Sequence, residues 1–140
     1  FLLLIILSLA AAIIYEKNKK ENNRIIKINL DTKVEETLNW KFSTKNKFID
    51  IKIGQVYKID FKVENYSSRK TSGKAIYEVK PDFIKKYFVE IDCFCYKKQT
   101  LLPSEKSAYS ITFYIDPKIL NDFKADDIKD INISYTFLNT

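Results

Sequence analysis

The stretch Ile131-Asn132-Ile133-Ser134-Tyr135-Thr136-Phe137 alternates apolar and polar side chains at period two. Successive side chains of a β-strand point to opposite faces, so this pattern predicts a strand with one face in a core. β-Branched and aromatic residues, which strands favour, supply its apolar positions. Because the same pattern recurs upstream, strands decide the fold of this chain.

Segments of this kind follow one another from Arg24 onward, separated by turn residues such as Asn65-Tyr66-Ser67-Ser68 and Lys80-Pro81-Asp82. Residues 117–130 are the one stretch without strand character, and they suit a helical turn or a packed loop. Seven or eight short strands without a long helix among them predict an all-β fold, an antiparallel β-sandwich. The expected strands are Ile25–Leu30, Leu38–Phe42, Lys47–Ile53, Val56–Glu64, Lys74–Val79, Tyr87–Tyr96, Tyr109–Ile115 and Asn132–Leu138.

The length and composition predict one folded domain. The chain has 140 residues, of which 46% are apolar and 14% aromatic, which is too hydrophobic for a disordered protein. Its net charge of +6 could suit nucleic acid or an anionic membrane surface. Its lysines are scattered, however, and arginine occurs only as Arg24 and Arg69. We therefore expect a domain over residues 25–140 and no nucleic-acid partner.

The chain begins with a hydrophobic run, FLLLIILSLAAAIIY, over residues 1–15. A membrane-spanning helix needs about 20 apolar residues, and a signal-peptide core needs fewer. The small residues 8–12 allow a cleavable signal peptide, but Ile13 and Ile14 continue the apolar run beyond them. We expect residues 1–15 to be an uncleaved transmembrane anchor, truncated at its start, and residues 16–24 to be a polar, basic tether.

Missing residue types exclude several kinds of chemistry. The sequence has no histidine and no methionine, which rules out imidazole metal sites, Ser-His or Cys-His nucleophiles and thioether ligands. The only glycines are Gly54 and Gly73, so a glycine-rich phosphate-binding loop cannot be formed. We expect that the protein is not an enzyme.

Cys93 and Cys95 are the only two cysteines, and they stand one residue apart. On a regular strand their Cα atoms would lie about 6.6 Å apart on one face, at the outer edge of what a disulfide tolerates. A metal ion bound by both sulfurs removes the need for this short Cα separation, because the sulfurs then need not touch. Two thiolates without other donors suit Cu(I), whereas zinc prefers four ligands, which two chains together could supply. Lys97 and Lys98 favour the thiolate form, and nearby acidic residues oppose it.

Core packing is the competing explanation for the pair, since cysteine is among the most buried residue types. On strict alternation the two cysteines share a face with Val89 and Ile91, and Phe94 lies on the opposite face with Glu90. If Phe94 is the core residue, a bulge or a strand end must present the sulfurs to solvent. The motif by itself leaves these alternatives open.

The surroundings of the pair resemble a known family. Residues 85–101, KKYFVEIDCFCYKKQTL, are similar to the signature of the Cox11/CtaG family of cytochrome c oxidase assembly proteins, in which a YF…I-x-CFCF-x-x-Q-x-L stretch carries copper-binding cysteines. Residues 73–81 resemble its G-x-A-x-Y-x-V-x-P block, residues 113–117 its FF-x-DP block and residues 133–137 its LSYTF block. Residues 38–42 resemble its LPW-x-F element, with Asn39 in place of proline. The resemblance covers residues 24–140.

This resemblance implies a fold, a ligand and partners. It implies a single transmembrane helix in an inner membrane and an immunoglobulin-like domain facing the periplasm or the mitochondrial intermembrane space. It further implies that Cys93 and Cys95 bind Cu(I), with Phe94, Tyr96 and Gln99 as supporting motif residues. The expected partners are an upstream copper donor, the CuB site of cytochrome c oxidase subunit I, which receives the copper, and a second copy joined through a shared copper site.

Two departures from the family pattern concern chemistry. An LY-x-x-FC-x-x-TG block, with a further cysteine, usually follows the membrane helix, but here Tyr15 runs straight into Glu16. Tyr109-Ser110 stand where the family tends to have Met-Pro. The pair must therefore work without a third sulfur. A thiol redox protein and a structural module without metal transfer stay open as alternative functions.

Overall fold

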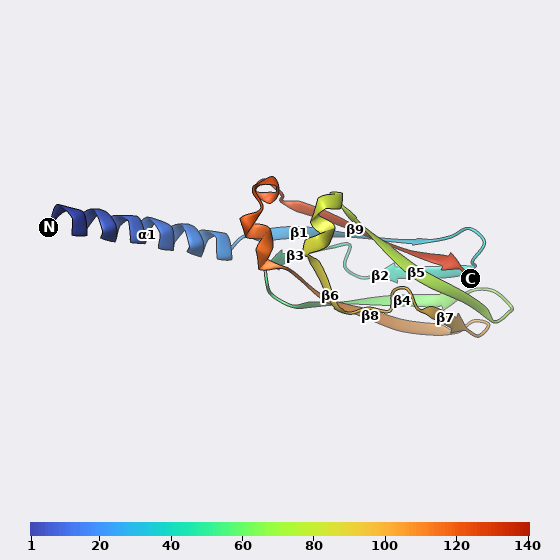
Figure 1. Cartoon of the computed structure of the whole chain (residues 1–140). Coiled ribbons are helices and arrows are strands. Elements are labelled where there is room, and N and C mark those ends of the chain that lie inside the picture. Colours follow the sequence, from blue (N-terminus) through green and yellow to red (C-terminus); the bar gives the residue numbers. More distant parts are fainter.

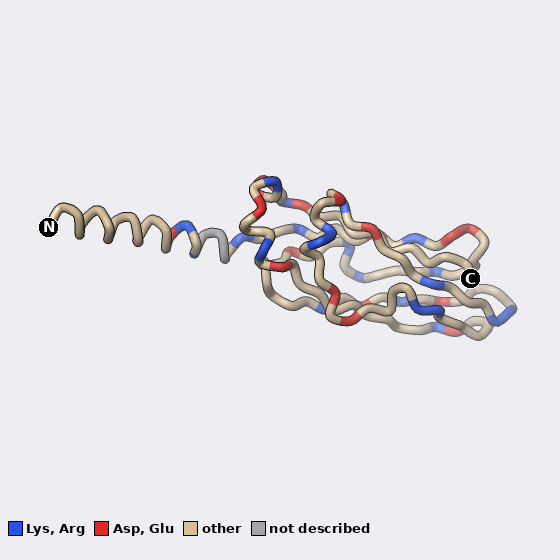
Figure 2. Tube along the Cα trace, in the orientation of Figure 1, with Lys and Arg blue, Asp and Glu red and all other residues tan. Residues whose placement is uncertain are grey.

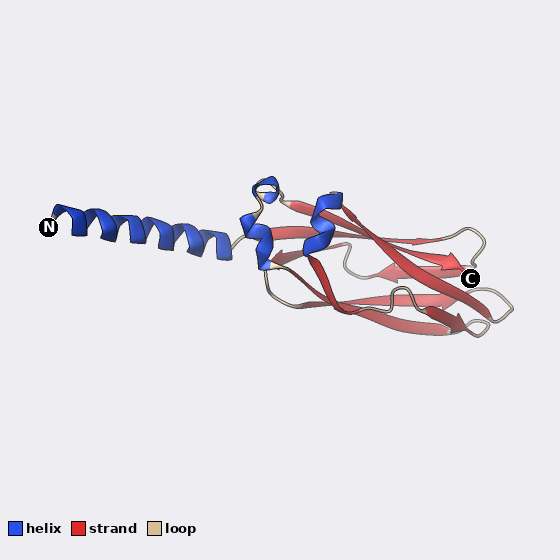
Figure 3. Cartoon of the chain, viewed as in Figure 1, coloured by secondary structure: helices blue, strands red, loops and turns tan.

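The chain folds into two β-sheets with a helix at its N-terminus (Figure 1). This computed structural model describes the backbone of residues 1–140 and the side chains of residues 1–19 and 23–140. Three short 3-10 helices lie at the end of the sandwich nearest the N-terminal helix (Figures 1 and 3). The elements are α1 (Leu2–Asn22), β1 (Ile25–Val34), β2 (Trp40–Thr44), β3 (Phe48–Lys52), β4 (Tyr57–Asn65), β5 (Thr71–Lys80), η1 (Asp82–Tyr87), β6 (Phe88–Asp92), β7 (Lys98–Leu101), β8 (Lys106–Ile115), η2 (Pro117–Asn121), η3 (Phe123–Ala125) and β9 (Asp130–Asn139).

The two sheets differ in strand direction. The five-stranded sheet has the order β3-β1-β9-β5-β7, and the four-stranded sheet has the order β2-β4-β8-β6. All pairs in the four-stranded sheet are antiparallel. In the other sheet β1 and β9 run parallel, with Ile28 opposite Ile131. The prediction of a wholly antiparallel sandwich was therefore wrong for this pair, because the first and last strands of the domain lie side by side.

Aromatic side chains fill the space between the sheets. Phe61 on β4 packs against Tyr135 on β9, with 5.3 Å between ring centroids. Phe42 on β2 meets Phe137 on β9 edge to face at 4.9 Å. Such pairs add to the stabilisation from burying their apolar area. The alternation in β9 predicts this arrangement correctly, since its apolar positions 131, 133, 135 and 137 are all fully buried.

Most of the expected strands are present with shifted ends. Residues 117–130 carry η2 and η3 and no strand until Asp130, as their composition predicts. The strand expected over Tyr87–Tyr96 is shorter, because β6 ends at Asp92. A ninth strand, β7, was not expected. Its sequence, Lys-Gln-Thr-Leu, has a single apolar residue, so no periodicity marks it.

Charged residues of both signs are interspersed along the strands of the sandwich (Figure 2). The lysines are likewise scattered along the sequence.

Helix α1 projects away from the sandwich, and its described side chains are exposed (Figure 1). It continues through residues 16–22, which sequence analysis assigned to a tether, and the side chains of residues 20–22 lie outside the described residues. Within the described part of the chain, no helix combines the length and the apolar character that crossing a membrane requires.

Candidate metal centre

The cysteine pair lies in a loop that runs between the two sheets. β6 is an edge strand of the four-stranded sheet, and β7 is an edge strand of the five-stranded sheet. Residues 93–97 connect them, so this loop crosses from one layer of the sandwich to the other (Figure 1). A loop at such an edge lies beside the core of the domain and also reaches its surface.

Phe94 fixes this loop to the core. Its ring stacks on Tyr109 of β8, with centroids 5.2 Å apart, and on Phe137 of β9, at 5.8 Å. It also meets Phe61 edge to face at 5.5 Å. Phe94 thus contacts both sheets and is only 7% exposed. The sequence left open whether the sulfurs or this ring face the core. In the structure it is the Phe94 ring that packs between the two sheets.

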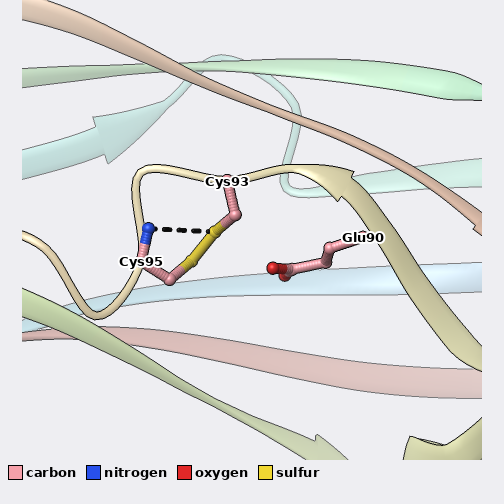
Figure 4. Close-up of side chains that lie close together, drawn as sticks. All are labelled: Glu90, Cys93 and Cys95. Atoms are coloured by element: carbon pink, nitrogen blue, oxygen red, sulfur yellow. Dashed lines mark hydrogen bonds between the residues drawn. A yellow bond between two sulfur atoms is a disulfide. The ribbon is translucent and has the colours of Figure 1, made fainter.

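The two sulfurs form a disulfide across the loop (Figure 4). Cys93 is half-buried and Cys95 is buried at the rim of the core. The backbone N–H of Cys95 donates a hydrogen bond to the Cys93 sulfur over 3.1 Å. Tyr96 adopts a left-handed conformation, with φ of 61°, and its N–H donates to the carbonyl of Ala75 on β5. This hydrogen bond ties the turn to the five-stranded sheet.

The expected geometry of the pair was wrong, because the pair does not lie on a strand. Its Cα atoms are 5.2 Å apart instead of the ~6.6 Å of a regular strand, which is within the usual range for a disulfide. Pairing between β6 and β8 shifts register between Glu90 and Asp92, and the strand then ends. The backbone bend that a local bridge requires is supplied by this strand end.

Glu90 completes a group of three potential metal ligands. One carboxylate oxygen of Glu90 and the sulfurs of Cys93 and Cys95 all lie within 4.8 Å of one another. In Figure 4 the carboxylate points toward the disulfide. The hydroxyl of Tyr135 donates a hydrogen bond to Oε1 of Glu90 over 3.2 Å. Burial raises the pKa of Glu90 to about 7, and the hydrogen bond from Tyr135 opposes that shift.

Sequence reasoning missed Glu90 as a member of the site. Strict alternation from Cys93 backwards places Glu90 on the opposite face. The register shift breaks that alternation, so the carboxylate and the sulfurs come together. A bulge of this kind depends on the partner strand, and we find no signal for it in the local sequence.

The other motif residues, Tyr96 and Gln99, follow the pair along the chain. Tyr96 is exposed and meets Tyr77 of β5 edge to face at 5.8 Å. Burial, followed by the nearby Glu90 carboxylate, raises the pKa of Tyr77. Gln99 is half-buried in β7, opposite Gly73, and so helps to form the strand that follows the loop. Lys97 and Lys98 are exposed just beyond the pair.

Comparisons with known proteins show the family of this chain. The family described as "Cytochrome c oxidase assembly protein CtaG/Cox11" matches residues 8–139, nearly the whole chain. The chain belongs to the CtaG/Cox11 family. The match includes the C-F-C loop and all nine strands of the sandwich.

Curated members of the CtaG/Cox11 family are similar over most of the chain. The cytochrome c oxidase assembly protein CtaG of Bradyrhizobium diazoefficiens is 40% identical over 114 residues, which are 81% of this chain and 53% of that protein. Its namesake in Reclinomonas americana is 36% identical over 123 residues, 88% of this chain and 68% of that protein. The chain thus spans about half to two thirds of the length of these relatives. A solved PapD-like domain of human CEP192 is 12% identical, with a TM-score of 0.33 over 86% of this chain and 87% of that one.

Proposed function

We propose that this protein is a copper chaperone, which binds Cu(I) through the thiolates of Cys93 and Cys95. In this proposal it delivers the ion to the CuB centre of cytochrome c oxidase subunit I during assembly of the oxidase. It acts as a carrier and not as an enzyme. The observation that carries the proposal is the placement of both sulfurs in one turn, which Phe94 holds against the core of a CtaG/Cox11 domain.

The chemistry of the donors supports Cu(I) as the cargo. Cu(I) is soft and is satisfied by few sulfur ligands, and two thiolates are the softest donors that this chain contains. In the disulfide form the sulfurs are bonded to each other, so uptake requires prior reduction. A reducing thiol supplies it: two RSH molecules give two cysteine thiols and one RSSR, and Cu(I) then displaces the thiol protons.

The remaining parts of the proposal concern location and partners. The resemblance to the family supports an inner-membrane tether and an immunoglobulin-like domain on the periplasmic or intermembrane-space side. It also supports an upstream copper donor and a homodimer that shares copper between two pairs. Four thiolates from two chains would meet the same ion or cluster from opposite sides.

The disulfide itself favours a second candidate, a thiol redox protein. With Cα atoms 5.2 Å apart, the pair can cycle between dithiol and disulfide without a large movement of the loop. Such a protein would exchange with glutathione reversibly and would take up no metal. The two candidates therefore differ in one measurable property, which is metal uptake by the reduced form.

An anaerobic Cu(I) titration of the reduced protein against a tight competitor tests the proposal. We expect one Cu(I) per chain or per two chains in the wild type, and loss of tight binding in Cys93→Ser and Cys95→Ser. Thr100→Ser on β7, an exposed position near the loop, is the matched control and should bind as the wild type does. Equal binding by the wild type and Cys93→Ser would overturn the chaperone proposal.

A further inference from the structure

Glu90 is a third donor that a Cu(I) site of two thiolates does not need. Its carboxylate is half-buried and lies next to the two sulfurs, within 4.8 Å. Among the salt bridges of the described residues, none involves Glu90. A carboxylate removed from water without a cation is unfavourable unless a partner compensates for it. The surroundings of Glu90 therefore favour a positive ion at this point.

Tyr135 holds the carboxylate in place. Its side chain is fully buried, and its hydroxyl donates to Oε1 of Glu90. No hydrogen bond of the described residues uses Oε2 of Glu90, which leaves that oxygen available to a ligand. Carboxylates that bind metals are commonly oriented by a hydrogen bond of this kind from a neighbouring group. The arrangement resembles a ligand with its supporting residue.

The distances suit a tetrahedral ion after reduction. Around Zn²⁺ with bonds of about 2.3 Å to sulfur and 2.1 Å to oxygen, donor atoms lie about 3.6–3.8 Å apart. The three donors here lie within 4.8 Å, so the carboxylate has to approach the sulfurs by about 1 Å at most. Once the disulfide is reduced, the sulfurs are free to separate, and Cα atoms 5.2 Å apart allow both to reach one ion.

We propose that the reduced form of this protein also binds a divalent borderline metal, Zn²⁺, through Cys93, Cys95 and the carboxylate of Glu90. A hard oxygen donor adds affinity for Zn²⁺ and little for Cu(I). A divalent ion also neutralises one more of the three negative charges than Cu(I) does. Three protein ligands leave a fourth position open to water or to a donor from another molecule. Glu90 thus biases the pair toward Zn²⁺ and makes this ion a competitor for the copper site.

The proposed Zn²⁺ site uses the same sulfurs as the proposed copper site, but Zn²⁺ binding does not require that copper binds. Reduction by a dithiol converts the disulfide into two thiols and leaves the reductant as a cyclic disulfide. Zn²⁺ then replaces the two thiol protons. No other change in oxidation state is involved, because Zn²⁺ has no redox chemistry.

The test compares Zn²⁺ and Cu(I) binding by the reduced full chain in three variants. Glu90→Gln keeps the shape of the side chain and removes its charge. Asp92→Asn is the matched control, an exposed acid two residues farther along. Tyr135→Phe removes only the hydrogen bond to Glu90. Zn²⁺ affinity is measured by competition with a chelator, and Co²⁺ serves as a spectroscopic probe of thiolate ligation and tetrahedral geometry.

We expect the wild type to bind one Zn²⁺ per chain, and Glu90→Gln to weaken this binding by at least tenfold, with Cu(I) affinity changed less than about threefold. Asp92→Asn should change neither. Tyr135→Phe should weaken Zn²⁺ binding by a smaller factor. Wild-type Zn²⁺ affinity in Glu90→Gln, or an equal loss in Asp92→Asn, would overturn the inference.

The same titrations separate this inference from the proposed function. If the wild type binds no Cu(I) but binds Zn²⁺ in a way that depends on Glu90, only the chaperone proposal is overturned. Tight Cu(I) binding without any Zn²⁺ uptake would overturn only the present inference. A Glu90→Gln variant that fails to fold would lose both metals. In that case the Tyr135→Phe variant tests the inference, because it should weaken Zn²⁺ binding and leave Cu(I) binding unchanged.

Discussion

The ring of Phe94 stacks on the ring of Phe137, with 5.8 Å between centroids and 20° between ring planes. Phe94 belongs to the loop between the cysteines, and Phe137 belongs to the last strand of the domain. The contact ties the candidate metal centre to the packing of the sandwich. The position of the two sulfurs therefore depends on the core and not only on their neighbours in sequence.

Truncation of this ring should destabilise the domain and loosen the site. We expect Phe94→Ala to lower the free energy of unfolding by about 3–5 kcal/mol, since it removes a buried aromatic side chain from between the sheets. Tyr96→Ala removes an exposed ring two residues away and should cost far less, about 1 kcal/mol or below. Urea unfolding measures both. Equal costs would mean that Phe94 does not anchor the loop.

Reduction of the disulfide should leave the fold intact. The bridge closes a very short loop, so its effect on the unfolded chain is small, about 1–2 kcal/mol. Phe94 and the hydrogen bond from Tyr96 to Ala75 hold the turn in either redox state. We expect urea unfolding with and without a thiol reductant to differ by no more than this amount. The Cys93→Ser/Cys95→Ser double variant should match the reduced protein, and loss of near-ultraviolet circular dichroism on reduction would contradict the prediction.

The hydrogen bond between Tyr87 and Asp122 should make stability depend on pH. The Tyr87 hydroxyl donates to Oδ2 of Asp122 over 2.7 Å, and this bond is the main reason that the pKa of Asp122 is lowered. The unfolded chain then binds more protons than the folded one between the lowered pKa and the ordinary value near 4. The resulting stability is present above about pH 4 and is lost as the pH falls through the lowered pKa.

Tyr87→Phe should remove most of this dependence. The difference in unfolding free energy between wild type and variant is expected to be constant near neutral pH and to shrink toward zero in acid. Tyr114→Phe, which changes a tyrosine on β8, controls for general effects of losing a hydroxyl. Chemical unfolding at several pH values from 2 to 7 is the measurement. A difference that grows in acid would refute the assignment.

A side chain at Gly73 should be unfavourable. A Cβ at this position would lie 2.8 Å from a methyl carbon of Leu38 and 3.0 Å from the ring of Trp40. Gly73→Ala is therefore expected to destabilise the domain by about 1–3 kcal/mol through overpacking. In a Leu38→Ala background the same change should cost less, because the nearest atom is gone. Thermal unfolding of the four proteins of this cycle tests the coupling, and strict additivity would count against it.

The sequence by itself determined the strands and the chemistry of the donors. Alternation at period two is a local property, so it identified β9 and its buried side chains Ile131, Ile133, Tyr135 and Phe137 correctly. The absence of histidine and methionine likewise limited any soft-metal site to the two cysteines. The observed strand ends differ from the expected ones by a few residues, because the end of a strand depends on where its partner strand stops.

Only the tertiary structure decided how these parts meet. The parallel pairing of β1 with β9 joins segments about a hundred residues apart, and β7 becomes a strand only because β5 offers it an edge. The register shift after Glu90 depends on β8, and it brings a carboxylate next to sulfurs that local alternation placed on the other face. No local sequence pattern predicts pairing and packing between distant segments. They set the 5.2 Å spacing of the cysteines and the presence of Glu90 beside them.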